Sequence, residues 1–462
     1  MAIDPISASA AEIARAVNAG ETSATEVIQS TLLTIRMHDP LLNCFTAVTE
    51  ERARTRAQAV DRAGTRNKGR LAGVPFAAKN LFDIEGLATL AGSKINSARA
   101  PAPRDAALIE RLESAGAILV GALNMGEYAY DFTGENIHAG PTRNPHDLSR
   151  MTGGSSGGSG GAVAGALVPL ALGSDTNGSI RVPASLCGLF GLKPTYGRLT
   201  RARTFPFVAS LDHLGPLART TKDLALAYDA MQGPDPEDPA CAQRAAEPVT
   251  PLLGRAAEGL TIAVAGGYFR AGASPEAFAA VDRLAAALAV NRDIELPQAA
   301  RARAAAYVIT ATEGACLHLD RLRAQAADFD PAVRDRLIAG AMVPAALVDK
   351  AQIFRRWYRT QVLELFDEVD AILAPATPCT APAIGQINFM LDGQEVPIRA
   401  NLGIYTQPIS FIGLPVVAVP VPLAPLPIGV QIIAAPWRED VALRIAYALE
   451  QMGVATAPTP PA

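Results

Sequence analysis

The sequence predicts an α/β fold, and three observations support this. Apolar runs of strand length alternate with helical segments along most of the chain, which is typical of a sheet covered by helices. Hydrophobic residues make up 49% of the 462 positions, so the chain can bury a large core. A glycine- and serine-rich stretch, residues 151–192, leads directly into apolar sequence. We therefore interpret it as part of the core, where glycine allows close backbone approach, and not as a flexible linker.

The first third of the chain predicts a helical layer followed by the first strands. Residues 7–63 are helical in pattern, and Ser9 and Ser23 each have a glutamate three residues later, which is the capping-box spacing. The apolar run 73–79 predicts a buried strand with Lys79 near its carboxyl end. A helix over 104–117 and a strand over 117–125 follow.

The later elements continue the alternation. Residues 191–220 are rich in proline and glycine, and we expect irregular covering structure there. Residues 234–251 are the most linker-like. The remaining expected elements are helices at 221–233, 275–290, 298–325 and 347–369, strands within 259–270, 371–378 and 413–440, a last helix ending at Met452, and a disordered tail at 456–462.

Composition excludes several classes of function. The net charge of −4 gives no bulk attraction to nucleic acid or to an anionic membrane. Five scattered cysteines without paired spacing indicate reduced thiols and neither a disulfide framework nor a metal site. The amino terminus lacks the pattern of a signal peptide, and the longest apolar stretch, 161–173, is too short to span a bilayer. We therefore expect a cytoplasmic protein.

Two small-residue turns carry hydroxyl groups that could act as nucleophiles. One is GGSSGG at 153–158, and the other runs from Ser174 to Ser179. A serine nucleophile needs a base, and a lysine can take that role without histidine. Lys79 is one of only six lysines in the chain, and it lies within an apolar run. Burial disfavours the ammonium form, and a pKa lowered to roughly 7–8 would let Lys79 accept a proton.

Other meanings of the glycine-rich stretch are less well supported. No lysine lies between positions 95 and 192, which excludes a phosphate-binding P-loop there. Residues 154–158 also match GxSxG, the serine-hydrolase elbow, whose base would be His213 or His318. That elbow requires a strand immediately before it, and the residues before Gly153 do not have strand character.

Lys79, GGSSGG at 153–158 and DTNGSIR at 175–181 together resemble the amidase signature family. The resemblance spans nearly the whole chain and implies one catalytic domain, residues 1–455, with a large twisted mixed sheet and helices on both faces. Within it we expect the helical layer at 7–63, the catalytic core at 70–230, and completing elements at 255–452. It implies that Ser179 is the acyl-forming nucleophile, that Ser155, held by a cis peptide bond, links it to Lys79, and that Lys79 is the base.

The resemblance also implies an oxyanion hole and supporting residues. The oxyanion hole consists of the backbone N–H groups of Thr176, Asn177, Gly178 and Ser179. Many family members have Gly-Gly before the nucleophile, so Asn177 is a departure that bears on specificity. The remaining candidates for substrate binding or loop support are Gly153, Gly154, Ser156, Asp175, Arg181, Tyr130 and Asp131. Asp175 and Arg181 could form a buried ion pair, or Arg181 could face an anionic substrate; Tyr130 and Asp131 could line a pocket or serve only packing.

These expectations describe an amide hydrolase that works through an acyl-enzyme without metal or organic cofactor. The resemblance extends to further runs, such as 79–96, 206–218 and 308–320. It implies a small, planar, anionic urea-type substrate that loses ammonia. It also implies dimerisation and a small helical partner subunit. The alternatives are the glutaminase subunit of a tRNA-dependent amidotransferase, another small-amide amidase acting on allophanate or malonamate, and a non-catalytic scaffold subunit.

Overall fold

Eleven strands drawn from both halves of the chain form one mixed sheet. The computed structural model describes residue 4, residues 7–63 and residues 69–460. The strand order is β1-β3-β2-β6-β8-β7-β14-β15-β11-β9-β10. The strands of this sheet are β1 (Phe45–Val48), β2 (Pro75–Lys79), β3 (Ile118–Leu123), β6 (Leu170–Asp175), β7 (Phe190–Lys193), β8 (His213–Ala218), β9 (Ile262–Ala265), β10 (Asp293–Ile294), β11 (Ala371–Pro375), β14 (Val416–Val421) and β15 (Ile428–Ala434).

Two small antiparallel hairpins lie outside the main sheet, and fourteen α-helices are found among the described residues. The hairpins are β4–β5 (Arg143–Asn144 and Asp147–Met151) and β12–β13 (Asn388–Leu391 and Gln394–Pro397). The helices are α1 (Ala10–Ala19), α2 (Ala24–Leu42), α3 (Glu50–Arg62), α4 (Ala107–Ser114), α5 (Gly157–Ala164), α6 (Arg181–Leu186), α7 (Thr221–Met231), α8 (Pro275–Ala287), α9 (Ala299–Gln325), α10 (Pro331–Ala341), α11 (Ala345–Leu365), α12 (Ile398–Asn401), α13 (Gln407–Ser410) and α14 (Glu439–Gln451).

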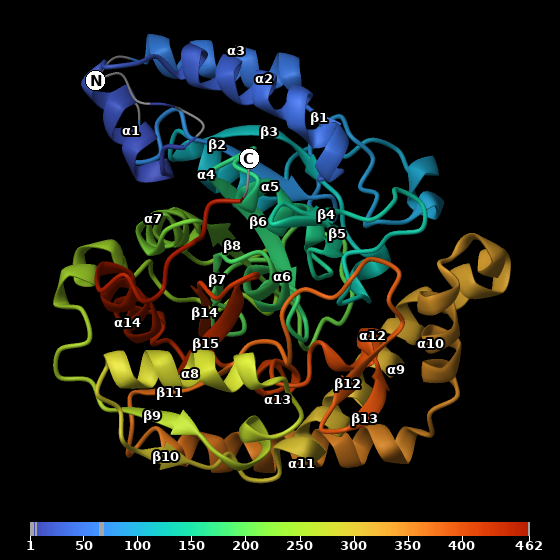
Figure 1. Ribbon diagram of the computed structural model, residues 1–462. Helices are drawn as coiled ribbons and strands as arrows, with labels where there is room; N and C mark the ends of the chain where they lie inside the picture. Colours follow the sequence, from blue (N-terminus) through green and yellow to red (C-terminus); the bar gives the residue numbers. More distant parts are fainter. Residues whose placement is uncertain (1–3, 5–6, 64–68, 461–462) are drawn as a thin grey trace.

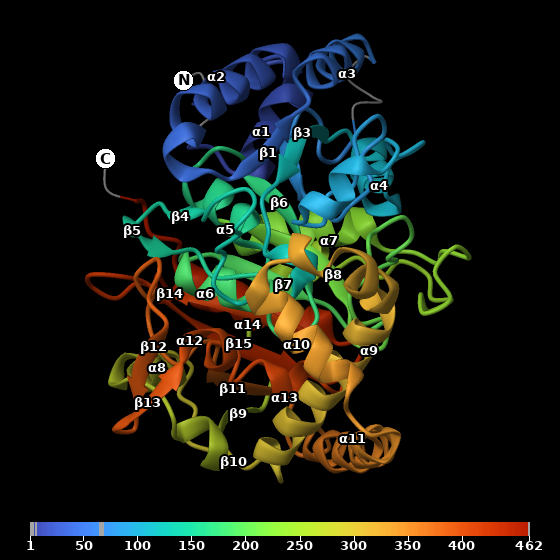
Figure 2. The ribbon, with the colours of Figure 1, turned by 90° about the vertical axis from the view of Figure 1, so that its right-hand side faces the viewer.

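Helices cover both faces of the sheet, as the connections require. Strand β2 leads through α4 to its parallel neighbour β3, and β3 leads through α5 back past β2 to β6. The two connections run in opposite directions along the sheet, so right-handed crossovers place α4 and α5 on opposite faces. Helix α6 contacts α5, whereas α7 contacts α4 and α14. Figure 1 and Figure 2 show α1–α3 at the β1 end and α11 near β9 and β10.

The amino-terminal capping boxes are confirmed, and two other expectations were wrong. The side chains of Ser9 and Ser23 each accept a hydrogen bond from the backbone N–H of the glutamate three residues on. The side chain of that glutamate in turn accepts a hydrogen bond from the backbone N–H of the serine. Residues 191–220 are not all irregular, because they contain most of β7 and all of β8 at the centre of the sheet. The glycine-rich loop also ends earlier than expected, since Gly157–Ala164 form α5.

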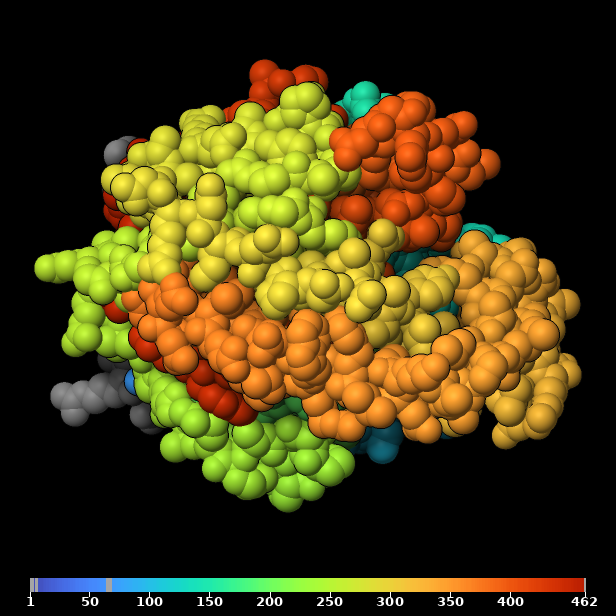
Figure 3. Space-filling model, turned by 90° about the horizontal axis from the view of Figure 1, so that it is seen from below, coloured from blue at the N-terminus to red at the C-terminus, as the bar shows by residue number. Residues whose placement is uncertain are grey.

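The tail and the helical region 299–365 complete the fold. The tail, expected to be disordered over 456–462, is described as far as residue 460, and Pro458 lies beside Gly188; residues 461 and 462 lie outside the described range. Figure 3 shows the face formed by α9–α11 with the β12–β13 hairpin beside it. No single helix in the described chain has the length and apolarity to cross a membrane, and only α10 with α11, bent by 95°, passes as a pair.

Candidate active site

Two neighbouring parallel strands end at the same polar cluster. Strands β2 and β6 pair side by side, with Ala78 opposite Leu172. Lys79 therefore ends β2 close to Ser174 on β6. Its Nζ lies 2.6 Å from Ser155 Oγ, 3.0 Å from Ser156 Oγ and 2.8 Å from Ser174 Oγ. Lys79 is fully buried, so these three hydroxyls are its polar surroundings.

Burial lowers the pKa of Lys79 to about 7, although the carboxylates of Asp175, Asp212 and Asp131 act in the opposite direction. The value agrees with the expectation from sequence. It places the amine where it can be neutral near physiological pH and can accept a proton.

The three hydroxyls cannot all make the same kind of hydrogen bond to a neutral amine. The Ser156 hydroxyl donates to the backbone carbonyl of Ser174 at 3.2 Å, so it accepts from Lys79. A neutral amine has two N–H donors and one lone pair, which leaves one donor and the lone pair for Ser155 and Ser174. Ser155, at 2.6 Å, can therefore donate its proton to Lys79 while Ser174 accepts the second N–H.

The loop that carries Ser155 is held by backbone hydrogen bonds and packs closely against Asp131. The peptide bond between Gly154 and Ser155 is cis, as the family resemblance implies. The N–H groups of Gly153 and Gly154 donate to the carbonyls of Thr133 and Phe132, at 3.1 and 2.8 Å. A Cβ on Gly154 would meet Asp131 Oδ2 at 2.6 Å, so glycine is needed for this close approach. Ser155 is fully buried.

The turn between β6 and α6 carries Ser179 and a set of free backbone donors. Gly178 has φ of +144°, a conformation that favours glycine, and a Cβ there would lie 2.2 Å from Thr406 Oγ1. The N–H groups of Asn177, Gly178 and Ser179 donate no hydrogen bond to any residue that the structure describes. Buried backbone donors are rarely left without a partner, so this turn is arranged to receive an oxygen atom.

Asp175 and Arg181 form a fully buried ion pair below this turn. The Arg181 guanidinium donates to both carboxylate oxygens of Asp175, at 3.0 and 2.9 Å, and also to Gln431 Oε1 at 2.6 Å and to Ser410 Oγ. Burial alone would raise the pKa of Asp175, but the adjacent guanidinium holds that pKa well below its usual value. Arg181 lines neither of the cavities at the site. The geometry therefore favours the buried ion pair with Asp175 over a contact between Arg181 and an anionic substrate.

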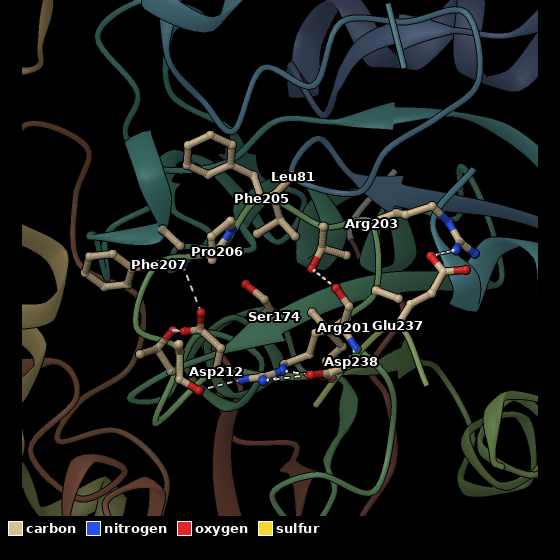
Figure 4. A pocket seen from close by; sticks show the side chains of 16 residues that line it. Leu81, Ser174, Arg201, Arg203, Phe205, Pro206, Phe207, Asp212, Glu237 and Asp238 are labelled. Atoms are coloured by element: carbon tan, nitrogen blue, oxygen red, sulfur yellow. Dashed lines mark hydrogen bonds and ion pairs between the residues drawn. The ribbon is translucent and has the colours of Figure 1, made fainter. Parts of the chain in front are cut away.

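Two adjoining cavities open at the ends of these strands. The narrower one, about 20 Å³, is lined by Ser179 together with Tyr130, Asp131, Asn177 and further residues from α9, α10 and α12. The larger one, about 190 Å³, reaches Ser174 and is bordered by Phe205, Asp212 and an outer rim of arginine and acidic side chains (Figure 4). Ala129, Thr176 and Phe207 border both cavities, so together they offer space for a small substrate beside Ser179.

Two arginines line the narrow cavity, and they differ in whether a carboxylate pairs with them. Arg399 donates to Asp131 Oδ1 at 2.8 Å and is thereby largely neutralised. Arg336 lies with its guanidinium carbon 3.8 Å from the centre of the Tyr130 ring and donates to the backbone carbonyl of Tyr130. No carboxylate in the described part of the chain lies within ion-pair distance of Arg336. The cavity therefore offers a positive charge to an anionic ligand.

Strand β5 does precede the glycine-rich loop, contrary to the expectation from sequence, but the histidines do not support the elbow interpretation of GxSxG. The serine of that motif is Ser156, which contacts Lys79 and the Ser174 backbone. His213 Nδ1 lies 3.1 Å from the Asp175 carbonyl, and burial lowers the pKa of His213 well below its usual value. Burial likewise lowers the pKa of His318 to about 3. Neither histidine contacts a serine hydroxyl, and no cluster of metal-ligating side chains occurs among residues 7–63 and 69–460.

The structure thus brings several of the candidate residues together and adds some that sequence reasoning missed. Lys79, Ser155 and Ser156 are in direct contact, and Ser179, Tyr130 and Asp131 line the narrow cavity. Ser174 was overlooked as a Lys79 partner, although its place at the end of the strand next to β2 is a usable signal. The residues contributed by distant elements gave no such signal: Tyr307, Thr310, Arg336, Arg399 and Gln407.

Comparison with known proteins places this site in a family context. The amidase family model matches residues 26–443. The chain is 54% identical to AtzE, a 1-carboxybiuret hydrolase subunit of Pseudomonas sp. (strain ADP), covering 96% of this chain and 98% of that protein. It is 38% identical to a Glutamyl-tRNA(Gln) amidotransferase subunit of Azotobacter vinelandii (strain DJ / ATCC BAA-1303), covering 96% of each.

A solved structure is similar over nearly the whole chain. It is described as a vestigial protein complex that reveals the evolutionary origins of an s-triazine catabolic enzyme. Its TM-score is 0.96 at 54% identity, and the match covers 98% of this chain and 100% of that one. A structure of a Glutamyl-tRNA(Gln) amidotransferase subunit from Thermotoga maritima matches with a TM-score of 0.84 at 29% identity, covering 100% of this chain and 99% of that one.

Proposed function

Since this chain belongs to the amidase signature family and is an amidohydrolase, we propose that it hydrolyses 1-carboxybiuret, a small anionic urea-type amide, with release of ammonia. The observation that carries the proposed chemistry is the buried contact of 2.6 Å between Lys79 Nζ and Ser155 Oγ, in a site that also holds Ser179. The likeness to a carboxybiuret hydrolase subunit over 96% of the chain supports the choice of substrate.

In the proposed mechanism Ser179 attacks the terminal amide carbonyl. Its proton moves to Ser155, whose own proton moves to the lone pair of neutral Lys79. The carbonyl oxygen becomes an oxyanion held by the free backbone N–H groups before and at Ser179, each worth on the order of 10²–10³ in rate. The proton returns through Ser155 to the departing nitrogen, and ammonia leaves an acyl-Ser179. Water then resolves this ester by the same proton path and releases a carboxylate.

Substrate charge is the second element of the proposal. Arg336 projects from α10 into the narrow cavity with Ser179 and has no carboxylate partner in the described structure. A planar guanidinium suits a carboxylate, and a urea-type chain separates the carboxylate from the reacting carbonyl. We therefore assign Arg336 to the carboxylate of the substrate. Arg336→Met should raise KM for an anionic amide by at least about tenfold, since a hydrogen bond to a charged group is worth ~1.5–3 kcal/mol.

Assembly and location are part of the same proposal. The 1-carboxybiuret hydrolase relative is named as a subunit, and the similar solved structure is of a protein complex. We extend this to dimerisation of this chain and to a small helical partner subunit. We also propose a cytoplasmic location, which is supported by five cysteines that form no disulfide with one another in the structure.

Ammonia release from a panel of amides tests the substrate. The panel holds 1-carboxybiuret, biuret, allophanate, malonamate, glutamine and a simple aliphatic amide. We expect 1-carboxybiuret to give the highest kcat/KM and Ser179→Ala to abolish turnover with unchanged circular dichroism. Preference for glutamine would favour the amidotransferase alternative, and near-normal activity of Ser179→Ala would remove the nucleophile assignment. Absence of activity on every amide would favour a scaffold role.

A further inference from the structure

The side chain of Asn177 occupies an unusual place in the nucleophile turn. It lies two residues before Ser179, and both residues line the narrow cavity. Its backbone carbonyl accepts a hydrogen bond from Thr406 Oγ1 at 2.6 Å, which fixes the backbone at this point. Its Nδ2 donates to Thr310 Oγ1 on α9 at 2.8 Å, and Thr310 also lines the cavity. The residue is therefore held both at its backbone and at one end of its carboxamide.

The other end of the carboxamide has no partner. Asn177 is 6% exposed, and its Oδ1 is buried without a hydrogen bond to any described residue. A buried acceptor without a donor is unfavourable, and most such groups in proteins are satisfied by a partner or a ligand. Because Thr310 uses the Nδ2 end, the Oδ1 end remains as a free acceptor on a residue that lines the same cavity as Ser179.

We propose that Asn177 Oδ1 accepts a hydrogen bond from the substrate N–H that flanks the reacting carbonyl, and so selects urea-type amides over carboxamides. This inference rests on the proposed function. In a urea-type substrate the carbonyl has nitrogen on both sides: one leaves as ammonia and the other carries an N–H. In a carboxamide such as malonamate or glutamine, the second neighbour is a CH₂ group, which cannot donate and would leave Oδ1 unsatisfied.

Thr310 is a positioning residue in this arrangement. A carboxamide that can rotate freely could present either its oxygen or its NH₂ group to the substrate. The bond from Nδ2 to Thr310 Oγ1 holds one orientation, so Oδ1 is the free acceptor of this side chain before the substrate binds. A merely structural role for the pair would alter stability but would not change which substrate atom is preferred.

Isosteric substrates allow a direct test. Allophanate and malonamate differ by NH against CH₂ beside the reacting carbonyl, and biuret and malonamide differ in the same way. The measured quantity is the ratio of kcat/KM within each pair, compared between wild type and variant, because intrinsic reactivity cancels in that comparison. Asn177→Leu removes the acceptor at similar volume, and Asn177→Gly restores the residue found at this position in many amidases.

We expect Asn177→Leu to reduce the NH/CH₂ preference by about 10- to 100-fold, chiefly through slower reaction of the NH compound. Asn177→Gly gives the same direction and serves if the leucine variant does not fold. Thr310→Val should lower the preference to a smaller degree. Thr312→Val is the matched control, because among the described residues its hydroxyl bonds only to the carbonyls of Val308 and Ile309 on the same helix; its preference should stay at the wild-type value.

The outcomes separate this inference from the function on which it rests. If wild type hydrolyses 1-carboxybiuret but Asn177→Leu and Asn177→Gly keep the wild-type ratio within each pair, the role of Asn177 is overturned and the proposed function stands. If wild type hydrolyses no urea-type amide, the proposed function fails, and the role of Asn177 fails with it. A reduced ratio in both variants with an unchanged Thr312→Val supports the inference.

Discussion

At the scale of single residues, two buried lysines show why contacts decide function. Burial lowers the pKa of both Lys79 and Lys193 to about 7. Lys193 Nζ donates to the backbone carbonyls of Pro194 and Leu414, and a carbonyl has no proton to give. Lys79 contacts three hydroxyls, which can both accept and donate. Of the two, therefore, Lys79 can act as a base, while Lys193 ties β7 to the residues that precede β14.

The pKa of Lys79 predicts the pH dependence of catalysis. The base must be neutral, and an amine is neutral above its pKa, so activity should be lost as pH falls through about 7. We expect log kcat/KM to rise with a slope near one below that pH and to level off above it. A pH-rate profile from about pH 5.5 to about 9 checks this. A profile that is flat across the neutral range would contradict Lys79 as the base.

The Asp175–Arg181 ion pair predicts a stability effect separate from binding. Arg181→Met leaves the buried Asp175 charge without its partner, which should lower the free energy of unfolding by about 3–5 kcal/mol. Thermal unfolding and urea titration measure the loss. Any folded fraction should keep a wild-type KM, because Arg181 lines neither cavity. A large rise in KM without a loss of stability would instead assign Arg181 to the substrate.

The rarity of a residue type largely determined which site residues could be predicted. Lysine occurs six times in the chain, so Lys79 in an apolar run stood out, and the two serine turns were visible from their glycines. Arginine is abundant, and nothing near Arg336 distinguishes it from surface arginines on other helices. Its role depends on α10 folding back over the turn at Ser179, which local sequence does not reveal.

At the scale of elements, the errors in β7, β8 and α5 share a physical cause. Gly215 and Pro216 lie within β8 at the centre of the sheet, although proline lacks an N–H and is disfavoured there. A Cβ on Gly215 would lie 2.0 Å from the Leu192 carbonyl, so the neighbouring strand comes unusually close. In α5, glycines permit contact with strand ends although they are poor helix formers. Tertiary packing overrides local propensity in both cases.

The close approach of α5 predicts a sharp difference between two glycines. A Cβ on Gly158 would lie 2.5–2.7 Å from backbone atoms of Asn124 and Cys44, which cannot move away easily. Gly158→Ala should therefore cost about 1–3 kcal/mol of stability and displace the Ser155 loop, lowering kcat. Gly254→Ala is the matched control, because no atom lies within 4 Å of its Cβ position. Equal stability of the two variants would contradict this packing.

At the scale of the whole molecule, one sheet joins the two halves of the chain. Strand β7 pairs with β14, with Val416 opposite Lys193, so the sheet continues between strands that precede and strands that follow the linker-like residues 234–251. The α/β class followed from the alternation of apolar strands and helices. The strand order could not be predicted, because pairing between positions so far apart in the sequence leaves no periodic pattern in one chain.

This continuous sheet predicts a single unfolding transition. Both tryptophans, Trp357 and Trp437, lie in the later half, whereas circular dichroism reports helices and strands throughout. If the halves unfold together, urea curves from tryptophan fluorescence and from circular dichroism should coincide. Two separated midpoints would indicate that the halves are independent domains, and would remove the prediction of one catalytic domain over residues 1–455.

The proton-relay groups and part of the cavity wall around Ser179 come from different parts of the chain, and this has a consequence for the diversification of such enzymes. The proton-relay groups come from β2, the glycine-rich loop and the turn after β6, whereas six of the fourteen residues that line the narrow cavity come from α9, α10, α12 and α13, far along the chain. Substitutions in those later helices can change the accepted compound while the hydrolytic apparatus stays intact. New nitrogen sources could thus be acquired by descendants that inherit the same reaction and alter only the enclosure around it.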